Sequence, residues 1–431
     1  MKAGFFNVCI NPPVGTALEG LKLDAACTSI HDDLFIRALY LTHNETEVLI
    51  VTFDLLFFEQ AVIDRFKKAI GQSLNLQPDQ IFFNTSHTHA GPQVSRWNYS
   101  DGPDPRYLDQ IESTSLQAAG RAKSNAVTVT LWAGQTRTDL PVSRRLIGPD
   151  GKAQWKPSRT GPICDALPFC LLKDGSDKVV ALLFSVACHP SMIYESMISA
   201  DYPGAAMKKL NAHFQTDGSL FLQGAGGETK PRHVADGENR WRHGTWAEME
   251  AAGAEVADAV IAQARHSLTK IEPDLRFTFH ELQWPLLAPL PSRAHFAAVL
   301  QNPGTPPPQR RWAADMLQQL DQTGRLPQTV PIALQGLQLG KGLRLIGVAG
   351  EIVAPIGLSI LREFNHGVTF ALGYSNGCQI YLTTDAMLPE GGYEVDSYWE
   401  YHWPAPLAPG GEQLLLNAVR QIRDSGQIPN E

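Results

Sequence analysis

The amino-acid sequence predicts an α/β protein with mixed sheets flanked by helices, and three observations lead to this prediction. The 431 residues are 43% hydrophobic and 19% charged, a composition typical of a globular chain with a sizeable core. Short apolar runs rich in Val, Ile and Phe alternate with segments of helical periodicity. Several of these runs end in polar residues, and α/β proteins gather their ligands at the carboxyl ends of strands. We therefore expect a functional site at such strand ends.

The individual elements follow from the same patterns. The expected strands lie, in chain order, at residues 48–54, 81–83, 179–188, 220–222 and 343–348. The expected helices lie near 59–74, 245–268, 309–323 and 411–425. Residues 285–328 are rich in Pro, Gln and Arg, and they are interpreted as an excursion that contains one helix and is a candidate lid. Residues 1–431 are otherwise expected to form a single domain.

Charge and apolar patterning exclude several classes of partner. The formal net charge is −8 and no run of Lys or Arg exceeds two residues, so nucleic acid is not an expected partner. The N-terminal apolar stretch is too short and interrupted for a signal peptide, and no apolar stretch reaches the ~20 residues of a membrane span. The chain is therefore expected to be cytoplasmic, without integral membrane association. Its six cysteines form no CxxC pair and are expected to be reduced and mostly buried.

The tripeptide His87-Thr88-His89 is the sharpest local chemical signal. It follows the expected strand at 81–83, and Ala90-Gly91-Pro92 follows it in turn. Residues two apart on an extended segment project to the same side, so both imidazoles can address one metal ion or one substrate. A structural pair of hydrogen-bonded histidines is the alternative reading of the same spacing.

Two further strand ends carry His189 and Glu351. His189 follows an apolar strand and precedes Pro190, and a satisfied histidine near the core is the alternative to a ligand. Glu351 lies among small apolar residues, where burial penalises a carboxylate that is neither paired nor metal-bound. Together with His87 they would form a site of two histidines and one carboxylate, a set that suits zinc.

The motifs, taken together and in chain order, resemble the catalytic domain of the neutral/alkaline (non-lysosomal) ceramidase family. The segment 11–15 is similar to the start of that family, so the resemblance covers most of residues 4–405, with low identity between motifs. The segments that carry it are 84–92, 188–190, Gly350-Glu351 and the pair Tyr381 and Tyr393.

This resemblance implies a zinc amidase with one Zn²⁺ per chain. The residues it implies as metal ligands are His87, His189, Glu351 and Tyr381. The residues it implies around the scissile amide are His89, which would exchange protons, and Tyr393 and Arg144, which would donate hydrogen bonds to the developing oxyanion. The sequence Ser143-Arg144-Arg145 leaves either arginine open for that role, and we assign it to Arg144.

The chain also departs from the family pattern. Where the family carries Gly-Asp-Val-Ser-Pro, this chain has Gly227-Glu228-Thr229-Lys230-Pro231, so Glu228 replaces an aspartate and Lys230 a serine. Gly227, Glu228 and Lys230 are accordingly expected to contact the substrate. The family's C-terminal immunoglobulin-like domain and its secretion signal are also missing from the sequence, which favours a small or soluble N-acyl compound over a bilayer ceramide.

The sequence therefore predicts a zinc-dependent hydrolase of a linear, non-peptide amide. An esterase or lactam hydrolase that uses the same site is one alternative, because activated water attacks any polarised carbonyl. A catalytically silent binding protein is another, with Arg96-Trp97 and residues 240–242 as its ligand surface. The expected partner is a small-molecule amide, and the oligomeric state is not predicted.

Overall fold

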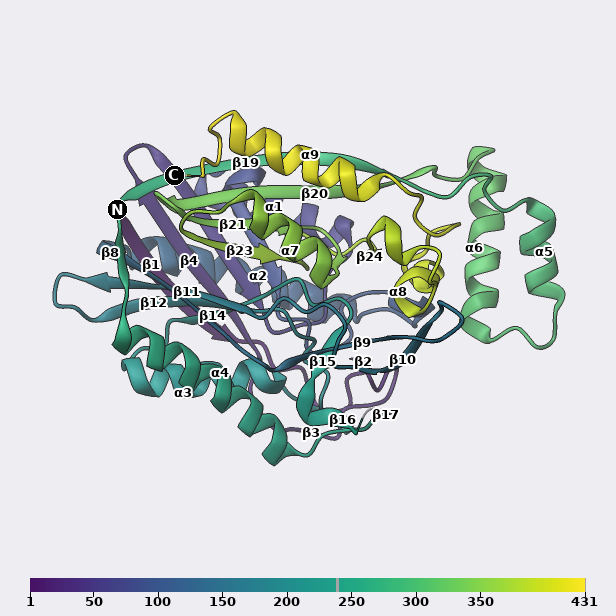
Figure 1. Cartoon of the computed structure of the whole chain (residues 1–431), viewed down its shortest axis with the longest axis horizontal. Helices are drawn as coiled ribbons and strands as arrows, with labels where there is room; N and C mark the ends of the chain where they lie inside the picture. Colours follow the sequence, from purple (N-terminus) through teal and green to yellow (C-terminus); the bar gives the residue numbers. More distant parts are fainter. Residues whose placement is uncertain (238–239, 431) are drawn as a thin grey trace.

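The computed structural model describes residues 1–237 and 240–430, which form four layers in the order helix, sheet, sheet, helix (Figure 1). Two mixed sheets pack face to face, and helices cover the outer face of each. This arrangement confirms the prediction of an α/β protein with mixed sheets flanked by helices.

The larger sheet has nine strands and is mostly antiparallel. Only the pairs β5–β6 and β12–β14 are parallel. Its order is β14 (Ser219–Gln223), β12 (Val179–Val186), β11 (Ala166–Asp174), β8 (Val127–Arg137), β1 (Lys2–Cys9), β4 (Phe35–His43), β5 (Thr46–Phe53) and β6 (Ile81–Thr85), with β18 (Thr269–Ile271) added beside β8.

The smaller sheet has four strands and covers the inner face of the larger one. Its order is β19 (Pro273–Pro285), β20 (Thr329–Gly340), β21 (Leu343–Val348) and β23 (Val368–Leu372). Leu and Ile side chains of both sheets interdigitate between the layers, for example Leu39 and Ile50 of the larger sheet with Leu337 and Leu345 of the smaller. This apolar layer fixes the two sheets relative to each other.

Helices complete the outer layers. The larger sheet is covered by α1 (Gln60–Leu74) and α2 (Pro105–Ser124) on one half and by α3 (Asp201–Phe214) and α4 (Trp246–His266) on the other, and the smaller by α7 (Ala354–Glu363) and α9 (Gly411–Asp424). The helices expected at 59–74, 245–268 and 411–425 agree with α1, α4 and α9 to within two residues at each end. Helix α4 begins where Thr245 and Glu248 form a reciprocal capping box.

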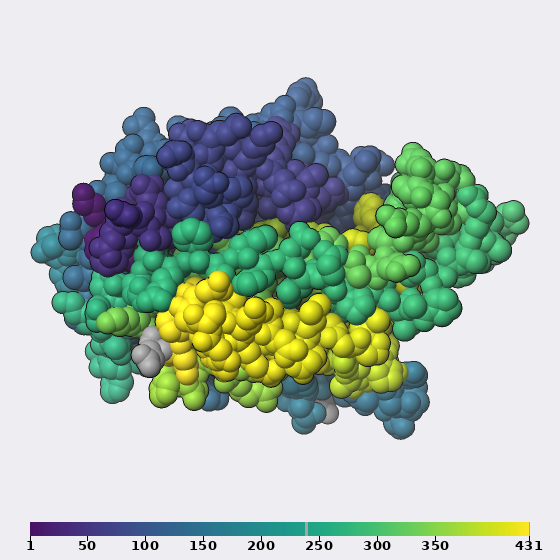
Figure 2. Space-filling model, turned by 90° about the horizontal axis from the view of Figure 1, so that it is seen from above, coloured from purple at the N-terminus to yellow at the C-terminus, as the bar shows by residue number. Residues whose placement is uncertain are grey.

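The excursion at 285–328 contains two helices rather than the one that was predicted. Helix α6 (Pro307–Thr323) contains the expected helix, and α5 (Arg293–Gln301) precedes it. The shorter helix has the signal of an N-cap, because the Ser292 hydroxyl accepts from the His295 N–H, but its nine residues show little periodicity. The pair lies beside the layers at one end of the molecule (Figures 1 and 2).

Short strands form small sheets of their own, and several of them follow the carboxyl ends of strands such as β6, β14 and β23. They pair as β10 (Ala153–Ser158), β9 (Pro141–Ile147) and β15 (Thr229–Pro231); β2 (Leu18–Gly20) with β7 (Ala90–Pro92); β22 (Glu351–Ile352) with β24 (Tyr381–Leu382); β3 (Ser29–Ile30) with β13 (Met197–Ile198); and β16 (Ala235–Asp236) with β17 (Arg240–Trp241). A single helical turn, α8 (Tyr393–Asp396), closes this region.

The state of the cysteines and the character of the helices bear on two of the expectations from the sequence. All six cysteines are free thiols, and five of them are buried, whereas Cys9 is exposed. Among residues 1–237 and 240–430, none of the helices combines the length and apolar character needed to cross a bilayer.

The contact between α9 and β19 yields a stability prediction. A Cβ atom on Gly411, the first residue of α9, would overlap the indole of buried Trp284. We expect Gly411→Ala to lower the free energy of unfolding by about 1–3 kcal/mol, as overpacked sites do. The measurement is the unfolding midpoint. Gly120→Ala is the matched control, because open space surrounds that position inside α2, and an equal loss in both variants would contradict the steric argument.

Candidate metal centre

Three strand ends meet at the buried side chain of Asn84. Its Oδ1 accepts from the Gln223 N–H at the end of β14 (2.8 Å), and its Nδ2 donates to the Gly373 carbonyl just after β23 (2.9 Å). Strands β6 and β14 lie at opposite ends of the sheet order, yet this amide brings their carboxyl ends together. The segments after these three strands carry His87, Gly226 and Tyr374.

His87 follows β6 in a turn with a left-handed backbone. Its φ is 64°, a conformation uncommon outside glycine, and its N–H donates to the Leu55 carbonyl (2.9 Å). The ring is 1% exposed, and Nδ1 lies 3.1 Å from the Leu56 carbonyl oxygen. Because a carbonyl only accepts, Nδ1 carries the proton and Nε2 presents its lone pair.

His189 is held in the same manner on the other side of the site. Its Nδ1 lies 2.8 Å from the Gly226 carbonyl oxygen, so its Nε2 also presents a lone pair. Its main chain is fixed by an N–H bond to the Thr229 carbonyl. Burial, with Arg144 close by, lowers the pKa of His189 to about 4, so the ring is neutral at neutral pH, the form in which imidazole binds metals.

Glu351 supplies the third donor atom. Its Oε2 lies 3.4 Å from His87 Nε2 and 3.3 Å from His189 Nε2. Donor atoms about 2.0–2.2 Å from a tetrahedral zinc ion are about 3.3–3.6 Å apart, so these spacings fit such an ion. Burial raises the pKa of Glu351, but the two imidazoles outweigh it and hold that pKa well below its usual range.

Two tyrosines that sequence reasoning missed fix the carboxylate. The hydroxyl of Tyr374 donates to Oε2 (3.0 Å), and the hydroxyl of Tyr401 donates to Oε1 (2.5 Å). Tyr374 lies in the segment Gly373-Tyr374-Ser375, and its position directly after a strand was the signal that could have identified it. Tyr401 had no such signal, because it reaches Glu351 from a separate turn.

Tyr381 lies beside this group because β22 and β24 pair in parallel, with Glu351 opposite Tyr381. Its hydroxyl is 3.4 Å from His189 Nε2 and accepts from Arg144 Nη2 at 2.9 Å. Burial raises the pKa of Tyr381 well above its usual value, so it is a neutral phenol. The structure thus brings all four residues named as metal ligands to one point.

His89 lies at the edge of the same group. Its Nε2 is 3.1 Å from His87 Nε2, and its Nδ1 is buried without a hydrogen-bond partner among the described residues. One ring nitrogen from each of His87, His89 and His189 lies within 4.8 Å of the others, a grouping able to hold a metal ion. Burial, and then the other two imidazoles, lowers the pKa of His89 well below its usual value, so this ring is neutral.

The two neighbouring arginines take different positions. Arg144 is buried, and it binds Glu394 through Nε (2.7 Å) as well as Tyr381 through Nη2. Arg145 binds the other oxygen of Glu394 (2.7 Å) and reaches Glu390 and the Gly391 carbonyl, away from His87 and Glu351. Arg144 therefore faces the candidate site, whereas Arg145 binds Glu394, the carboxylate that also holds Arg144.

A cavity of about 340 Å³ opens onto these residues, and we call it the inner cavity. Its walls combine apolar and aromatic side chains with the polar groups of the site. The lining residues are Gly20, Leu21, Leu56, Phe57, His87, His89, Trp97, Arg144, Trp155, Ser191, Lys230, Glu351, Tyr381, Tyr393 and Tyr401. His189 lies beneath this surface and is fully buried.

Tyr393 lines the inner cavity on α8, and its hydroxyl donates to Glu400 at 2.8 Å. Burial, and then Glu400, raises the pKa of Tyr393 well above its usual value, so it remains a hydrogen-bond donor at neutral pH. The ring packs edge-on against Trp155, whose indole in turn covers the Arg144 guanidinium at 4.3 Å.

Of the three residues expected to contact the substrate, Gly227, Glu228 and Lys230, only one lies on the inner cavity. Lys230 lines the inner cavity, but Gly227 and Glu228 do not. The Gly227 N–H donates to the Ile352 carbonyl, and a Cβ atom there would crowd that backbone. Both carboxylate oxygens of Glu228 accept from the N–H of Ala354, the first residue of α7, so this side chain occupies a helix N-terminus.

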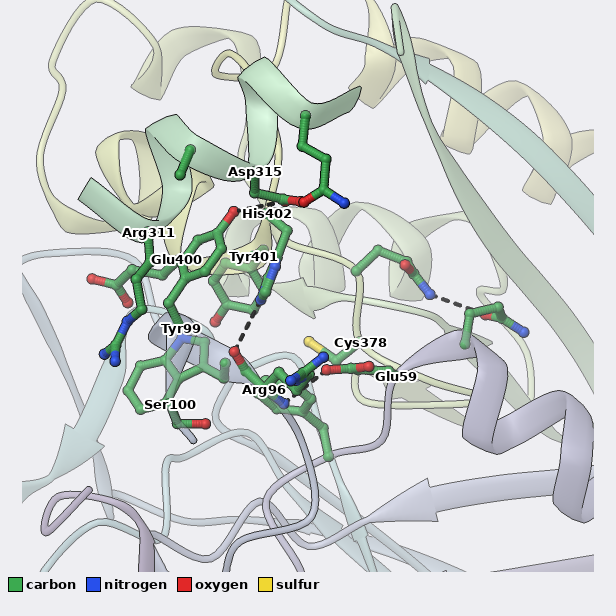
Figure 3. A pocket seen from close by; sticks show the side chains of 16 residues that line it. Glu59, Arg96, Tyr99, Ser100, Arg311, Asp315, Cys378, Glu400, Tyr401 and His402 are labelled. Atoms are coloured by element: carbon green, nitrogen blue, oxygen red, sulfur yellow. Dashed lines mark hydrogen bonds between the residues drawn. The ribbon is translucent and has the colours of Figure 1, made fainter. Parts of the chain in front are cut away.

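A second hollow of about 550 Å³, the side cavity, shares Phe57, Trp97 and Tyr401 with the inner cavity. Figure 3 shows Arg311 and Asp315 of α6 facing Tyr99 and His402 across it. The Tyr99 hydroxyl donates to Asp315 (3.2 Å), so the excursion forms one wall of this cavity. Arg96 lies here too, whereas β17 with Arg240 and Trp241 lies outside both cavities.

The structural class of this protein follows from these observations. It is a mixed α/β protein with a buried cluster of histidines, a carboxylate and a tyrosine beneath an apolar cavity. No sequence model of a protein family matches this chain, and no curated protein matches it by sequence. Among the solved structures that match its fold are two that match over the whole chain at 16% identity. They are a neutral ceramidase from Pseudomonas aeruginosa, with TM-score 0.75 and 75% of that chain covered, and a ceramidase complexed with C2, with TM-score 0.73 and 76% covered.

The chain therefore has the fold of neutral ceramidase, which confirms the fold that the sequence motifs implied.

The burial of Lys230 yields a prediction on stability and pH. Burial, and then Arg144, lowers the pKa of Lys230 to about 8, against 10.5 for an ordinary lysine. The free-energy cost of burying the charged Lys230 side chain is therefore at its full value below pH 8. This cost decreases as the pH rises from 8 to 10.5. We expect Lys230→Met to raise the free energy of unfolding at pH 7 by about 3 kcal/mol, and to have no effect above pH 10.5.

The measurement is chemical unfolding of the metal-free protein across this pH range. Lys68→Met, at an exposed position of α1, is the control and should change little. A loss of stability in Lys230→Met at pH 7 would contradict the assignment of a strained, buried ammonium.

Proposed function

We propose that this protein is a zinc-dependent hydrolase of linear, non-peptide amides. The observation that carries the proposal is the convergence of His87 Nε2, His189 Nε2 and Glu351 Oε2 at 3.3–3.4 Å, with both Nδ1 atoms bound to backbone carbonyls. Such tautomer-locking bonds are characteristic of histidines that bind metals. The ceramidase-like fold supports amide chemistry for the same site.

His87, His189 and Glu351 would hold the ion, with Tyr381 as a fourth, weaker ligand. A zinc ion in such a site supplies Lewis-acid chemistry, since it acidifies water and polarises a carbonyl group. The residues around it serve this chemistry by their charge states. Both imidazoles that face the ion present lone pairs, Glu351 is ionised, and Tyr381 is a neutral phenol that substrate can displace.

His89 is the residue we propose for proton transfer. It is neutral, lines the inner cavity, and lies next to the metal ligands without a fixed partner for Nδ1. It would take a proton from the attacking water and deliver one to the departing amine. Arg144 and Tyr393 would donate hydrogen bonds to the oxygen of the scissile carbonyl. In the structure these donors are bound to Tyr381 and Glu400, so substrate has to compete for them.

The inner cavity supports an apolar acyl group as one half of the substrate. Leu21, Leu56, Phe57 and Trp155 line it, and such surfaces bind alkyl and aryl groups by removing them from water. Because neither Gly227 nor Glu228 lines the cavity, we retain only Lys230 as a substrate contact. An ester or lactam would use the same site, and turnover of esters without amides would favour that alternative.

Metal content is the decisive first test. We expect about one zinc ion per purified chain, and loss of most of it in His87→Ala and in Glu351→Ala, because each change removes a donor atom. Elemental analysis measures this directly. His266→Ala, at an exposed histidine in the last turn of α4, is the control and should retain the metal. Zinc that persists in both site variants would contradict the proposed ligand set.

Tyr393→Phe separates catalysis from metal binding. The tyrosine contacts no metal ligand through its hydroxyl, so we expect full zinc content with a fall in kcat of about 10²-fold, the scale of losing one oxyanion donor. The measurement is steady-state hydrolysis of an N-acyl amide alongside elemental analysis. Tyr194→Phe, a surface tyrosine, is the control. If Tyr393→Phe lost zinc and activity to the same extent, Tyr393 would be a structural support of the site. If the wild type bound zinc but hydrolysed no amide, the silent binding protein would be favoured.

A further inference from the structure

Lys230 is a buried cation with no ion-pair partner in the part of the chain that the structure describes. Its side chain lines the inner cavity, and the residue is 7% exposed. Among residues 1–237 and 240–430, no carboxylate oxygen lies within 4.0 Å of its Nζ. The ring of Trp241 lies 5.6 Å away, and the buried Asp201 acts on the charge from beyond ion-pair distance. An ammonium in such surroundings is costly unless something else neutralises it.

The polar groups that line the inner cavity leave this charge uncompensated. Arg144 is neutralised by Glu394 at 2.7 Å, and Glu351 is committed to His87, His189 and the two tyrosines. Glu351 is the one carboxylate among the described lining residues. The pKa of Lys230, lowered by burial to about 8, still leaves the side chain mainly charged at neutral pH.

Ser191 offers a second unpartnered group on the same cavity. Its hydroxyl is buried and has no hydrogen-bond partner among the described residues. The neighbouring Pro190 carbonyl accepts from the His89 N–H (3.0 Å), and the His189 N–H donates to the Thr229 carbonyl next to Lys230. These two bonds join the segments that carry Ser191, Lys230 and His89 on one side of the metal centre.

We propose that the substrate carries a carboxylate on its amine half, which places it in the class of N-acyl amino acids. The Lys230 ammonium and the Ser191 hydroxyl would bind that carboxylate, and the apolar walls would bind the acyl chain. This inference rests on the proposed amide hydrolysis. In the reaction the carbonyl carbon–nitrogen bond breaks, water supplies OH to the acyl product, and the amine nitrogen takes up the proton delivered by His89.

The position of the Lys230 ammonium indicates that the substrate carboxylate lies on the amine half. His89 is the group proposed to protonate the leaving nitrogen, and both His89 and Lys230 line the inner cavity. Apolar side chains such as Leu56 and Phe57 provide the surface for the acyl half. One ammonium and one hydroxyl match the single charge of a carboxylate, whereas bound phosphate groups usually receive more donors.

The first experiment compares two amides that differ only in charge, N-octanoylglycine and N-octanoylglycinamide, with the zinc-loaded enzyme. We expect kcat/KM to favour the carboxylate by about ten- to a hundredfold, the range of a charge-assisted hydrogen bond. Lys230→Met should abolish this preference by raising KM for N-octanoylglycine, as expected when uniform binding is removed. Lys68→Met, at an exposed lysine, should behave as wild type.

Equal kcat/KM values for the two amides would overturn the inference and leave the amidase proposal standing. A preference for the monoamide of a dicarboxylic acid, such as N-butylsuccinamate, over N-octanoylglycine would also overturn it, since the carboxylate would then lie on the acyl half.

A binding measurement tests, independently of hydrolysis, whether Lys230 binds a carboxylate. In 4-oxoundecanoate a methylene group replaces the amide nitrogen of N-octanoylglycine, so it cannot be hydrolysed, and 4-oxoundecanamide is its uncharged partner. Calorimetry with the zinc-loaded protein should show tighter binding of the acid in wild type, and no difference between the two in Lys230→Met. If neither amide is hydrolysed, the amidase proposal fails; a Lys230-dependent preference for the acid then still supports the anion site, and its absence overturns it.

Discussion

The buried amide of Asn84 is the interaction on which the candidate site depends. Its three hydrogen bonds, to Gln223, Gly373 and Ser375, tie the ends of β6, β14 and β23 at one point, although these strands belong to two sheets. Each bond contributes about 1 kcal/mol net, but an unpaired backbone group left behind would cost about 1–3 kcal/mol more. The segments after these strands carry His87 itself, the Gly226 carbonyl that binds His189, and the Tyr374 hydroxyl that binds Glu351, so this one side chain helps to position three of the proposed ligands.

Backbone carbonyls then determine the chemistry of the histidines. The carbonyls of Leu56 and Gly226 accept from the Nδ1 atoms of His87 and His189, which leaves both Nε2 lone pairs directed toward Glu351. Two tyrosine hydroxyls orient the carboxylate from the opposite side. Both histidine rings are thus held by main chain and the Glu351 carboxylate by two tyrosine hydroxyls, and such support is what keeps a metal site in one geometry.

The inner cavity combines apolar walls with groups that lower the stability of the fold. Among the described residues, the buried Lys230 has no ion-pair partner and the Ser191 hydroxyl no hydrogen-bond partner. Such groups oppose folding, and functional sites are where proteins retain them. The side cavity adjoins it across Phe57, Trp97 and Tyr401, and Glu400 connects the two by binding the Tyr393 hydroxyl. The excursion at 285–328 contributes α6 to the side cavity, so it shapes the surroundings of the site rather than the metal centre.

The sequence by itself determined the fold class, because apolar runs and helical periodicity are local signals of burial. It pointed to His87, His189 and Glu351 through their places at strand ends, and to Tyr381 only through the resemblance to ceramidases. It also identified Lys230 as a departure from the ceramidase pattern. Only the tertiary structure decided that Arg144 rather than Arg145 faces the cavity, that Glu228 caps a helix, and that Tyr374 and Tyr401 hold Glu351. The reason is physical: neighbours in the chain alternate between opposite faces of a strand, and which face meets a cavity depends on contacts between residues far apart in sequence.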